Sequence, residues 1–500
     1  MRKTQLDILL HKTSSVMSII RKRKRITLLG FILIISLLAV WGILTLNPAG
    51  INSPVPTQPA NPPSKVTPHL TSTPVHVPQA TAAFKPISNF DIKMADLEGI
   101  SVNFWHNWSQ DRIAPLVNEF NAKNNWGIVV NASLYDSSND LSEALLAKLP
   151  GSDPPQVAVG YIDQALTWDT SGKLLDLAPY VNDPVWGLST EEQADYLLIF
   201  WDEGLVGGKR VSLPAQASGQ FLFYNQTWAQ ELGFTTPPQT SEEFRIQACA
   251  ANQQMRTDYT VANDSTGGWL VNTEAATVTA WIHAFGGEVA SPRSGKYYFK
   301  TSHSQEAFTF LKTLFDQNCA WVSIEAYPDE DFARRRAIFA TGSLADLPFI
   351  GQAISEANSN DQWTVLPFPS PDGQPAVIVS MPSFVLLPGT PQQQMAGWLF
   401  IRWMQAAAIQ AEWSRLTGDF PVRTSARALM ADYANFHPQW TAAIDLLPYA
   451  HRTPALASWK AVQWVVEDAG SQLFKSYFKL ERLDAMLAEM DKTAAELAEK

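Results

Sequence analysis

The chain of 500 residues is acidic, with 48 Asp and Glu against 37 Lys and Arg and a net charge of −11. Residues 1–46 hold eight of the basic residues and one acidic residue, so the rest of the chain carries 29 basic and 47 acidic residues. An acidic body of this kind argues against nucleic-acid binding, which needs clustered Lys and Arg to neutralise phosphates. The length and the hydrophobic content of 46% allow a large core and more than one domain.

The N-terminal end predicts a membrane segment. Residues 1–25 form a basic tail ending in RKRKR, and the uncharged apolar run of residues 26–46 follows directly. As a helix rising about 1.5 Å per residue, this run spans roughly 32 Å, close to the bilayer hydrocarbon thickness of about 30 Å. We expect a transmembrane anchor with the tail in the cytoplasm and the remaining chain outside. The alternative is a signal segment that is cleaved on secretion, although its apolar region is usually shorter, about 7–15 residues.

A stretch rich in Pro, Thr and Ser over residues 47–89 predicts a linker. Its composition cannot bury a core, and its prolines favour extended polyproline II. At about 3.1 Å per residue, some forty residues reach on the order of 120 Å. We therefore expect the folded body over residues 90–500, held away from the membrane by a stalk.

The folded body begins with apolar strands that alternate with amphipathic helices. We expect strands over residues 99–109, 127–136 and 155–163 and helices over residues 111–124, 140–150 and 165–181. Such alternation favours a parallel α/β sheet, in which ligands bind beyond the carboxyl ends of the strands. The candidate ligand-binding residues near those ends are Trp105, His106, Trp108, Tyr161 and Asp163.

The middle of the chain begins with a strand, a Tyr224-Asn225 turn and a helix that stops at Gly233. A Gly-rich loop with an aromatic residue and a helix ending in Gly-Gly follow over residues 267–289, and one more helical pattern covers residues 302–319. The candidate ligand-binding residues of this part are Gln216, Ser218, Trp269, Ser343 and Asp346.

The last third contains a Pro-bounded strand (363–373), an apolar strand (380–388) and a long helical run (392–418). The helical run stops at Gly418 and leads into TGDFPVRTSA, residues 417–426. In this turn Asp419 and Phe420 are candidate ligand contacts, and Arg423 is expected to be structural. A final amphipathic helix is predicted over residues 480–500.

The order and spacing of these motifs resemble the family 1 extracellular solute-binding proteins, the maltose-binding-protein-like sugar-binding components of bacterial ABC importers. The motifs that carry the resemblance are Phe104-Trp105, Leu213-Pro214, Tyr224-Asn225, Pro237-Pro238, Gly286-Gly287 and the TGDFPVR turn. Three positions depart from the family pattern: Gln156 stands where Asp is usual, Ser241 where Trp is common, and Arg335-Arg336 where Gly-Lys is usual.

The resemblance implies an α/β, two-lobed periplasmic-binding-protein-like fold of type II. The first lobe is expected over about residues 90–210 with part of 340–400, and the second over about 211–340 with the C-terminal helices. The implied activity is capture of a mono- or oligosaccharide by hinge closure and delivery to the permease of an ABC transporter, at the extracytoplasmic face of the membrane. Because such proteins are exported, we expect Cys249 and Cys319 to form a disulfide; two separate buried thiols are the alternative.

The candidate residues suit sugar binding better than catalysis. Some of the 18 tryptophans are expected to stack on sugar rings, and the others to lie in the core. The chain contains no G-x-S-x-G, H-E-x-x-H, G-x-x-x-x-G-K-[ST] or C-x-x-C motif, and its eight histidines are scattered. We therefore expect no enzyme activity, no cofactor and no metal. The alternatives are a binding protein for a polyol phosphate, polyamine or peptide, a glycan-active enzyme outside the cytoplasm, or a surface adhesin.

Overall fold

The computed structural model describes residues 86–151, 153–324 and 328–499. The expected cytoplasmic tail, the membrane segment of residues 26–46 and nearly all of the linker lie outside these ranges. Within the described ranges, no helix is both long enough and apolar enough to cross a bilayer.

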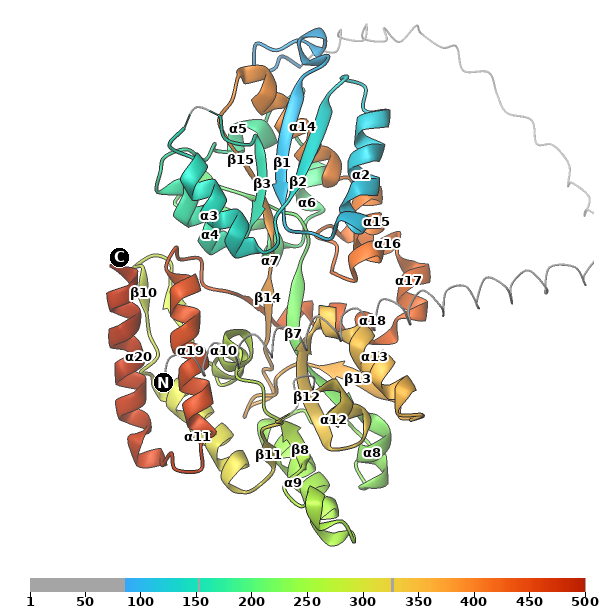
Figure 1. Cartoon of the computed structure of the whole chain (residues 1–500), viewed down its shortest axis with the longest axis vertical. Helices are drawn as coiled ribbons and strands as arrows, with labels where there is room; N and C mark the ends of the chain where they lie inside the picture. The colour runs from blue at the N-terminus through green and yellow to red at the C-terminus, as the bar shows by residue number, and fades with distance from the viewer. Residues whose placement is uncertain (1–85, 152, 325–327, 500) are drawn as a thin grey trace, which may run out of the picture. The chain divides into compact units, whose positions relative to one another are not determined.

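The first lobe is built on a five-stranded sheet in the order β2-β1-β3-β15-β6 (Figure 1). Its strands are β1 (Ser101–His106), β2 (Val129–Leu134), β3 (Val157–Gly160), β6 (Leu213–Pro214) and β15 (Ser383–Leu386). β1 runs parallel to β2 and β3, as predicted, but β15 is antiparallel to both of its neighbours. The sheet is therefore mixed, because a strand from the last third of the chain enters it between β3 and β6.

Helices cover both faces of this sheet. Alternate residues of β3 pack into two different core clusters, Val157 and Val159 into one and Ala158 into the other. The first cluster contains the buried faces of α2 and α14, and the second those of α3 and α4. The helices of this lobe are α2 (Gln110–Lys123), α3 (Ser138–Lys148), α4 (Ile162–Asp169), α5 (Ala178–Val181), α6 (Thr190–Ala194), α7 (Leu198–Trp201), α14 (Pro391–Met404), α15 (Ala407–Thr417) and α16 (Thr424–Ala428).

The second lobe has its own sheet, in the order β11-β8-β12-β7-β14-β16, with β13 also paired to β7. Its strands are β7 (Ser218–Asn225), β8 (Gly267–Leu270), β11 (Ala320–Trp321), β12 (Ala337–Ser343), β13 (Trp363–Leu366), β14 (Val377–Ser380) and β16 (Ala450–Arg452). Two short hairpins, β4–β5 (Leu205–Val206, Lys209–Arg210) and β9–β10 (Ala290–Ser291, Lys296–Tyr297), lie outside the two sheets.

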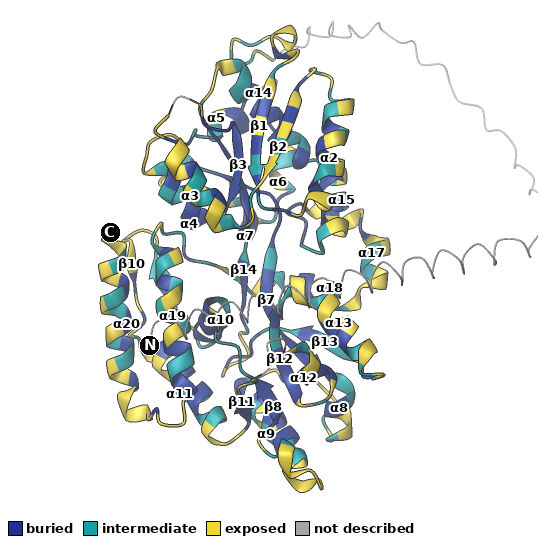
Figure 2. Ribbon diagram, in the orientation of Figure 1, coloured by how far each residue is buried: buried dark blue, intermediate teal, exposed yellow. Residues whose placement is uncertain are grey.

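The helices of the second lobe pack on the two faces of this sheet and leave their outer sides exposed (Figure 2). Leu222 and Tyr224 of β7 belong to the cluster that contains α9, α10, α11, α19 and α20, and Phe221 and Phe223 belong to the cluster that contains α12 and α13. These helices are α8 (Gln226–Glu231), α9 (Ser241–Thr257), α10 (Ala275–Ala284), α11 (Ser302–Asp316), α12 (Asp329–Ala333), α13 (Leu347–Glu356), α17 (Ala431–Phe436), α18 (Pro438–Ile444), α19 (Trp459–Leu473) and α20 (Leu483–Ala498).

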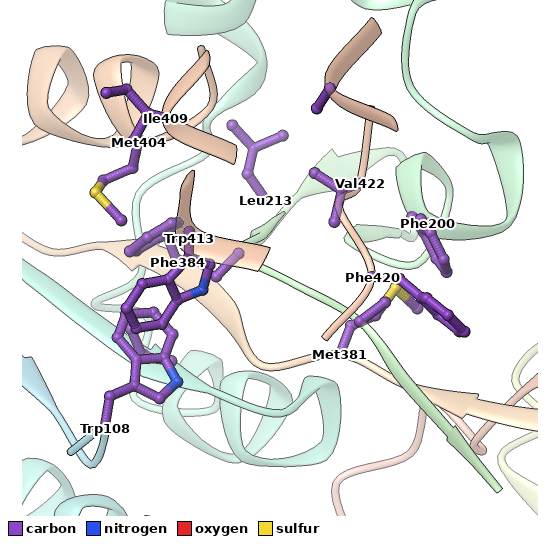
Figure 3. Packing of buried hydrophobic residues seen from close by; sticks show 14 of the residues in the cluster. Trp108, Phe200, Leu213, Met381, Phe384, Met404, Ile409, Trp413, Phe420 and Val422 are labelled. Atoms are coloured by element: carbon purple, nitrogen blue, oxygen red, sulfur yellow. The ribbon is translucent and has the colours of Figure 1, made fainter. Parts of the chain in front are cut away.

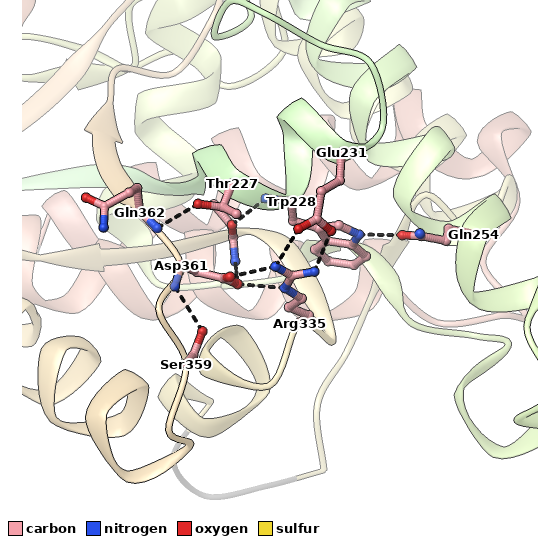
Figure 4. A network of polar contacts seen from close by, with 9 residues as sticks. Thr227, Trp228, Glu231, Gln254, Arg335, Ser359, Asp361 and Gln362 are labelled. Carbon is pink, nitrogen blue, oxygen red and sulfur yellow. Dashed lines mark hydrogen bonds and ion pairs between the residues drawn. The ribbon is translucent and has the colours of Figure 1, made fainter.

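A polar network holds the Tyr-Asn turn in the second lobe (Figure 4). Arg335 donates to both carboxylate oxygens of Asp361, at 2.7 and 2.6 Å, and also pairs with Glu231. Asp361 in turn accepts a bond from Asn225 Nδ2 at 2.7 Å. Arg335 has a positive φ of 57°, a conformation that favours glycine, and these charged bonds stabilise it there. The network therefore explains how Arg335 occupies a position where the family usually has glycine.

In the described part of the chain, three segments connect the lobes. One runs from β6 to β7, one from β14 to β15 and one from α16 to α17. Ala217, in the β6–β7 segment, exchanges two backbone hydrogen bonds, of 3.2 and 2.8 Å, with Phe420 in the loop between α15 and α16. Within residues 340–400, only the part from about Met381 onward joins the first lobe, because β12, β13 and β14 pair within the second sheet.

The two cysteines lie in the second lobe. Cys249 on α9 and Cys319, just before β11, are joined by a disulfide with their Cα atoms 4.4 Å apart. The bond links the helix over β8 to the strand beside β8.

Candidate functional site

Aromatic side chains lie at the carboxyl ends of the three parallel strands of the first lobe. Trp105, near the end of β1, packs against Tyr135, which follows β2, with ring centroids 4.8 Å apart. Tyr161 directly follows β3 and is 37% exposed. Because β2, β1 and β3 are neighbours, these rings belong to one edge of the sheet, which is where an α/β sheet binds ligands.

Asp163 lies in the first turn of α4, close to the second lobe. Its side chain is 6% exposed, and burial raises the pKa of its carboxyl, an effect that Lys460 partly offsets. Lys460 belongs to the first turn of α19, and the Thr167 hydroxyl on α4 donates to the carbonyl of Ala457 at 3.3 Å. The strand-end site of the first lobe therefore faces the start of α19.

Gln216 and Asp419 meet beside the paired residues Ala217 and Phe420. The Gln216 amide donates to Asp419 Oδ2 at 2.5 Å, and its oxygen accepts from the indole of Trp413. Burial raises the pKa of Asp419 to about 7, although Arg112 opposes the shift. Asp419 also raises the pKa of Tyr161, after the larger effect of burial. Tyr161, Asp163, Gln216 and Asp419 are thus the predicted residues that the structure brings together.

The polar surface continues along β7 into the second lobe. Residues two apart on a strand face the same side, so Ser218 and Gln220 share one face of β7, and Gln216 lies just before the strand. Gln220 donates to Glu274 and to the Thr277 hydroxyl, both at 3.0 Å, at the start of α10. Gln220 and Glu274 were not predicted; the two-residue period that continues from Gln216 and Ser218 was the signal for Gln220.

Ser343 and Asp346 mainly bond each other. Asp346 accepts from the backbone N–H of Ser343 at 2.7 Å and from its hydroxyl at 2.9 Å, which caps the short turn after β12. Ser343 nevertheless lies directly opposite Gln220 in the sheet, beside the polar face of β7. The pair therefore lies next to the site with part of its bonding capacity already used.

Trp269 and Phe420 are not available to a ligand. Trp269 is fully buried in the second lobe, where its indole packs edge-on against Trp281 and donates to the Thr341 hydroxyl at 2.9 Å. Phe420 is also fully buried and packs against Phe221 of β7. The expectation that these two rings contact a ligand is corrected, since every residue of β8 is buried and the Phe420 ring packs between Phe221 and Trp440.

His106 and Trp108 also point into the interior of the first lobe. Trp108 packs against Trp413, at 4.9 Å between ring centroids, and against Phe384 (Figure 3). The His106 side chain is fully buried beside Phe104, at 5.2 Å, and burial lowers its pKa to about 4. Both were expected in an open loop, but β1 continues through His106 and the even-numbered residues 102–108 face the core.

A second interlobe space lies on the side of α7. This cavity of about 720 Å³ is lined by Asp202 and Glu203 from the first lobe and by the end of α10 and β16 from the second. Glu203 is 4% exposed, and neither of its carboxylate oxygens has a hydrogen-bond partner among the described residues. Burial raises the pKa of Glu203 to about 8, although Arg452 lowers it in part.

The strand-end site is equipped to bind a polar molecule. It offers carboxylates and amides that exchange hydrogen bonds with hydroxyls, and aromatic faces beside them. Its carboxyl groups are those of Asp163, Asp419 and Glu274, and the raised pKa of Asp163 and Asp419 favours their uncharged forms.

Comparison with solved structures finds the same fold in binding proteins. The chain matches the cyclic α-maltosyl-1,6-maltose binding protein of Arthrobacter globiformis at 18% identity and a TM-score of 0.67, covering 80% of this chain and 99% of that one. It matches the sugar-binding protein MalE of Xanthomonas citri at 21% and 0.69, covering 80% and 97%. It matches UgpB of Mycobacterium tuberculosis, solved with glycerophosphocholine, at 17% and 0.64, covering 79% and 98%.

Comparison with curated protein sequences gives no match. A family model described as "bacterial extracellular solute-binding protein" matches residues 115–446, which include strands of both sheets and the three segments that connect the lobes. The chain therefore belongs to the bacterial extracellular solute-binding protein family.

Proposed function

We propose that this protein captures a neutral carbohydrate between its two lobes and delivers it to the permease of an ABC importer. The observation that carries the proposal is the run of polar residues Gln216, Ser218 and Gln220, in which Gln216 bonds Asp419 of the first lobe and Gln220 bonds Glu274 of the second. A ligand bonded along this face would contact both lobes at once. The structural relatives named above include two sugar-binding proteins.

Each part of the site has a role in this proposal. Asp163, Gln216, Asp419 and Ser218 exchange hydrogen bonds with sugar hydroxyls, together with Gln220 and Glu274 from the second lobe. Trp105 and Tyr161 present ring faces to the apolar C–H face of a sugar. Ser343 and Asp346 flank the site from the second sheet. Hinge closure at the segments that connect the lobes brings the two sets of contacts together.

We also propose where the protein lies in the cell. Residues 26–46 anchor the protein in the membrane, and the Pro-rich linker carries the binding unit to the extracytoplasmic side, near the permease. The protein binds and releases its ligand without chemical change.

The test is a ligand panel on the purified full-length chain. We would follow melting temperature and Trp fluorescence with mono- and oligosaccharides, polyol phosphates and polyamines, and recover the ligand afterwards. A saturable shift with one sugar class and unaltered sugar is the expected result. A shift with phosphates or polyamines alone would contradict the sugar assignment, and hydrolysed sugar would indicate a glycan-active enzyme.

Variants then locate the site. Tyr161→Ala and Asp163→Asn should weaken sugar binding by at least tenfold, since each removes a stacking or hydrogen-bonding group. Tyr477→Ala is the matched control, because Tyr477 is an exposed tyrosine that is not among the site residues and lies between α19 and α20. Equal affinity in all three variants would place the ligand elsewhere.

A further inference from the structure

Three side chains that commonly bind metal ions converge at the C-terminal end of α10. They are His283 on the last turn of the helix, Glu288 in the loop after it and His451 at the centre of β16. One potential ligand atom from each lies within 4.8 Å of the other two. His283 Nδ1 is 3.9 Å from Glu288 Oε2, and the two imidazole rings lie with their centroids 4.3 Å apart.

The turn that ends α10 brings Glu288 back beside His283. The N–H of Gly287 bonds the carbonyl of Ile282 at 2.9 Å, and that of Gly286 bonds the carbonyl of His283 at 2.8 Å. This is a Schellman ending, which requires a left-handed residue, and Gly286 supplies it with a φ of 82°. The chain therefore reverses directly after the helix, and the next side chain is Glu288.

Sheet register brings His451 to the same place from far along the chain. Gln220 of β7 lies opposite Ile378 of β14, and Ile378 is paired with His451 of β16. Paired residues face the same side of a sheet, so the three form a row. α10 crosses this row, with Thr277 bonded to Gln220 at one end and His283 against His451 at the other.

The pair of imidazoles has unused bonding capacity. His283 is 7% exposed, and its Nδ1 has no hydrogen-bond partner within the described residues. A buried polar atom is nearly always bonded, so an orphaned one calls for an explanation.

We propose that His283, Glu288 and His451 bind a divalent transition-metal ion, with zinc as the best fit. Two imidazoles and one carboxylate are a donor set that zinc accepts, with a fourth position left for water. Ligand atoms about 2.0–2.1 Å from the ion lie about 3.4 Å apart in tetrahedral geometry, so the 3.9 Å separation needs little adjustment. Calcium and magnesium prefer sites made of oxygen ligands.

The position of the site determines which parts of the protein a bound ion would connect. All three ligands line the 720 Å³ cavity, whose opposite wall carries Asp202 and Glu203 of the first lobe. A bound cation would therefore lie in a space shared by both lobes, which Arg293 and Arg452 also line. It would also fasten β16, the edge strand of the second sheet, to the end of α10.

Isothermal titration calorimetry of the purified full-length chain with zinc chloride, after treatment with a chelator, tests the site. We expect one ion per chain. His451→Gln should weaken binding by about 100-fold or more, since even partners outside the metal's own ligands contribute 10–100-fold. Glu288→Gln changes an exposed side chain, so it keeps the test valid even where the histidine variant folds poorly. His437→Gln, at an exposed histidine outside the cluster, is the control and should bind as the wild type does.

Cobalt(II) gives an independent readout. Its absorption in the visible range becomes intense in four-coordinate sites, and it should disappear in His451→Gln. The absence of zinc binding by the wild type, or equal affinity in His451→Gln, Glu288→Gln and the control, would overturn the proposal and show that the rings are only packed together. No sugar is used, so the result is independent of the proposed transport function.

Discussion

The two interlobe regions differ in how their polar groups are satisfied. At the strand-end site, Gln216 is bonded through both atoms of its amide, to Trp413 and to Asp419. In the cavity beside α7, Glu203 and His283 are buried with polar atoms that have no partner among the described residues. The strand-end site is thus ordered before any ligand arrives, whereas the cavity contains groups whose free energy would fall if a ligand or ion bonded them.

Trp269, which is buried outside both interlobe regions, provides a reference for the changes in unfolding free energy expected within them. Trp269→Ala should lower the free energy of unfolding by about 3–5 kcal/mol, because it empties a fully buried site and removes the bond to Thr341. Urea unfolding measures the loss. Trp464→Ala, at a tryptophan that is 67% exposed, is the control and should change the value by less than about 0.5 kcal/mol. A similar small change for both would contradict the burial of Trp269.

The most direct test of order at the strand-end site removes the amide of Gln216. Gln216→Leu should lower the free energy of unfolding by about 1–3 kcal/mol, since it leaves the Trp413 indole and the Asp419 carboxylate without their partner. The same urea experiment applies, together with the sugar titration. Ser218→Ala, two residues along the same face, should have little effect on unfolding. If both variants unfold alike, the Gln216 bonds do not order this region.

In the cavity, removing a charge should stabilise the protein. The pKa of Glu203 is raised from 4.5 to about 8 by burial, so unfolding releases a proton between these pH values and stability falls as pH rises through that window. Glu203→Gln should remove this loss and raise the free energy of unfolding by about 1–2 kcal/mol at pH 8. Thermal melting at pH 5 and pH 8 should show the gain growing with pH. A gain that is absent at pH 8 would mean that Glu203 is paired in solution.

The smallest expected effect is a pH dependence of sugar binding. The pKa of Asp419 is raised to about 7, so its carboxylate is lost as pH falls below 7. If that carboxylate accepts a sugar hydroxyl, affinity should fall by at most about tenfold per pH unit below 7 and level off above it. Titrations between pH 5 and 8 measure this, and Asp419→Asn should flatten the curve. A wild-type curve that is already flat would remove Asp419 from the contacts.

Much of the fold was predictable because it depends on local patterns. The buried face of α2, with Ile113, Leu116, Val117 and Phe120, follows the helical period, and Gly418 ends α15 with a positive φ. The two-lobed organisation followed from the order of motifs, and the family match confirms it. The antiparallel entry of β15 into the first sheet was not predicted, because pairing between distant strands leaves no local signal.

The site was predicted less well than the fold. Asp163, Gln216 and Asp419 stay predictions as ligand contacts, although the structure brings them into one region. Their signals were a strand end for Asp163, a segment that crosses between lobes for Gln216 and the TGDFP turn for Asp419. Trp269 and Trp108 could not be placed, because an indole at a strand end suits the core and a ligand equally well. The histidine cluster was missed for another reason: His283 and His451 are brought together by sheet register and not by spacing in the sequence.

The place of β15 in the first sheet has a consequence for how the chain is made. This strand lies between β3 and β6, yet it is synthesised long after both of them. Until residues 383–386 leave the ribosome, β3 and β6 have an open gap between them, and the whole second sheet except β16 is made in the meantime. The first lobe therefore cannot complete its sheet before most of the second lobe exists, and a chain that stops short of β15 would expose a strand edge that other chains can pair with.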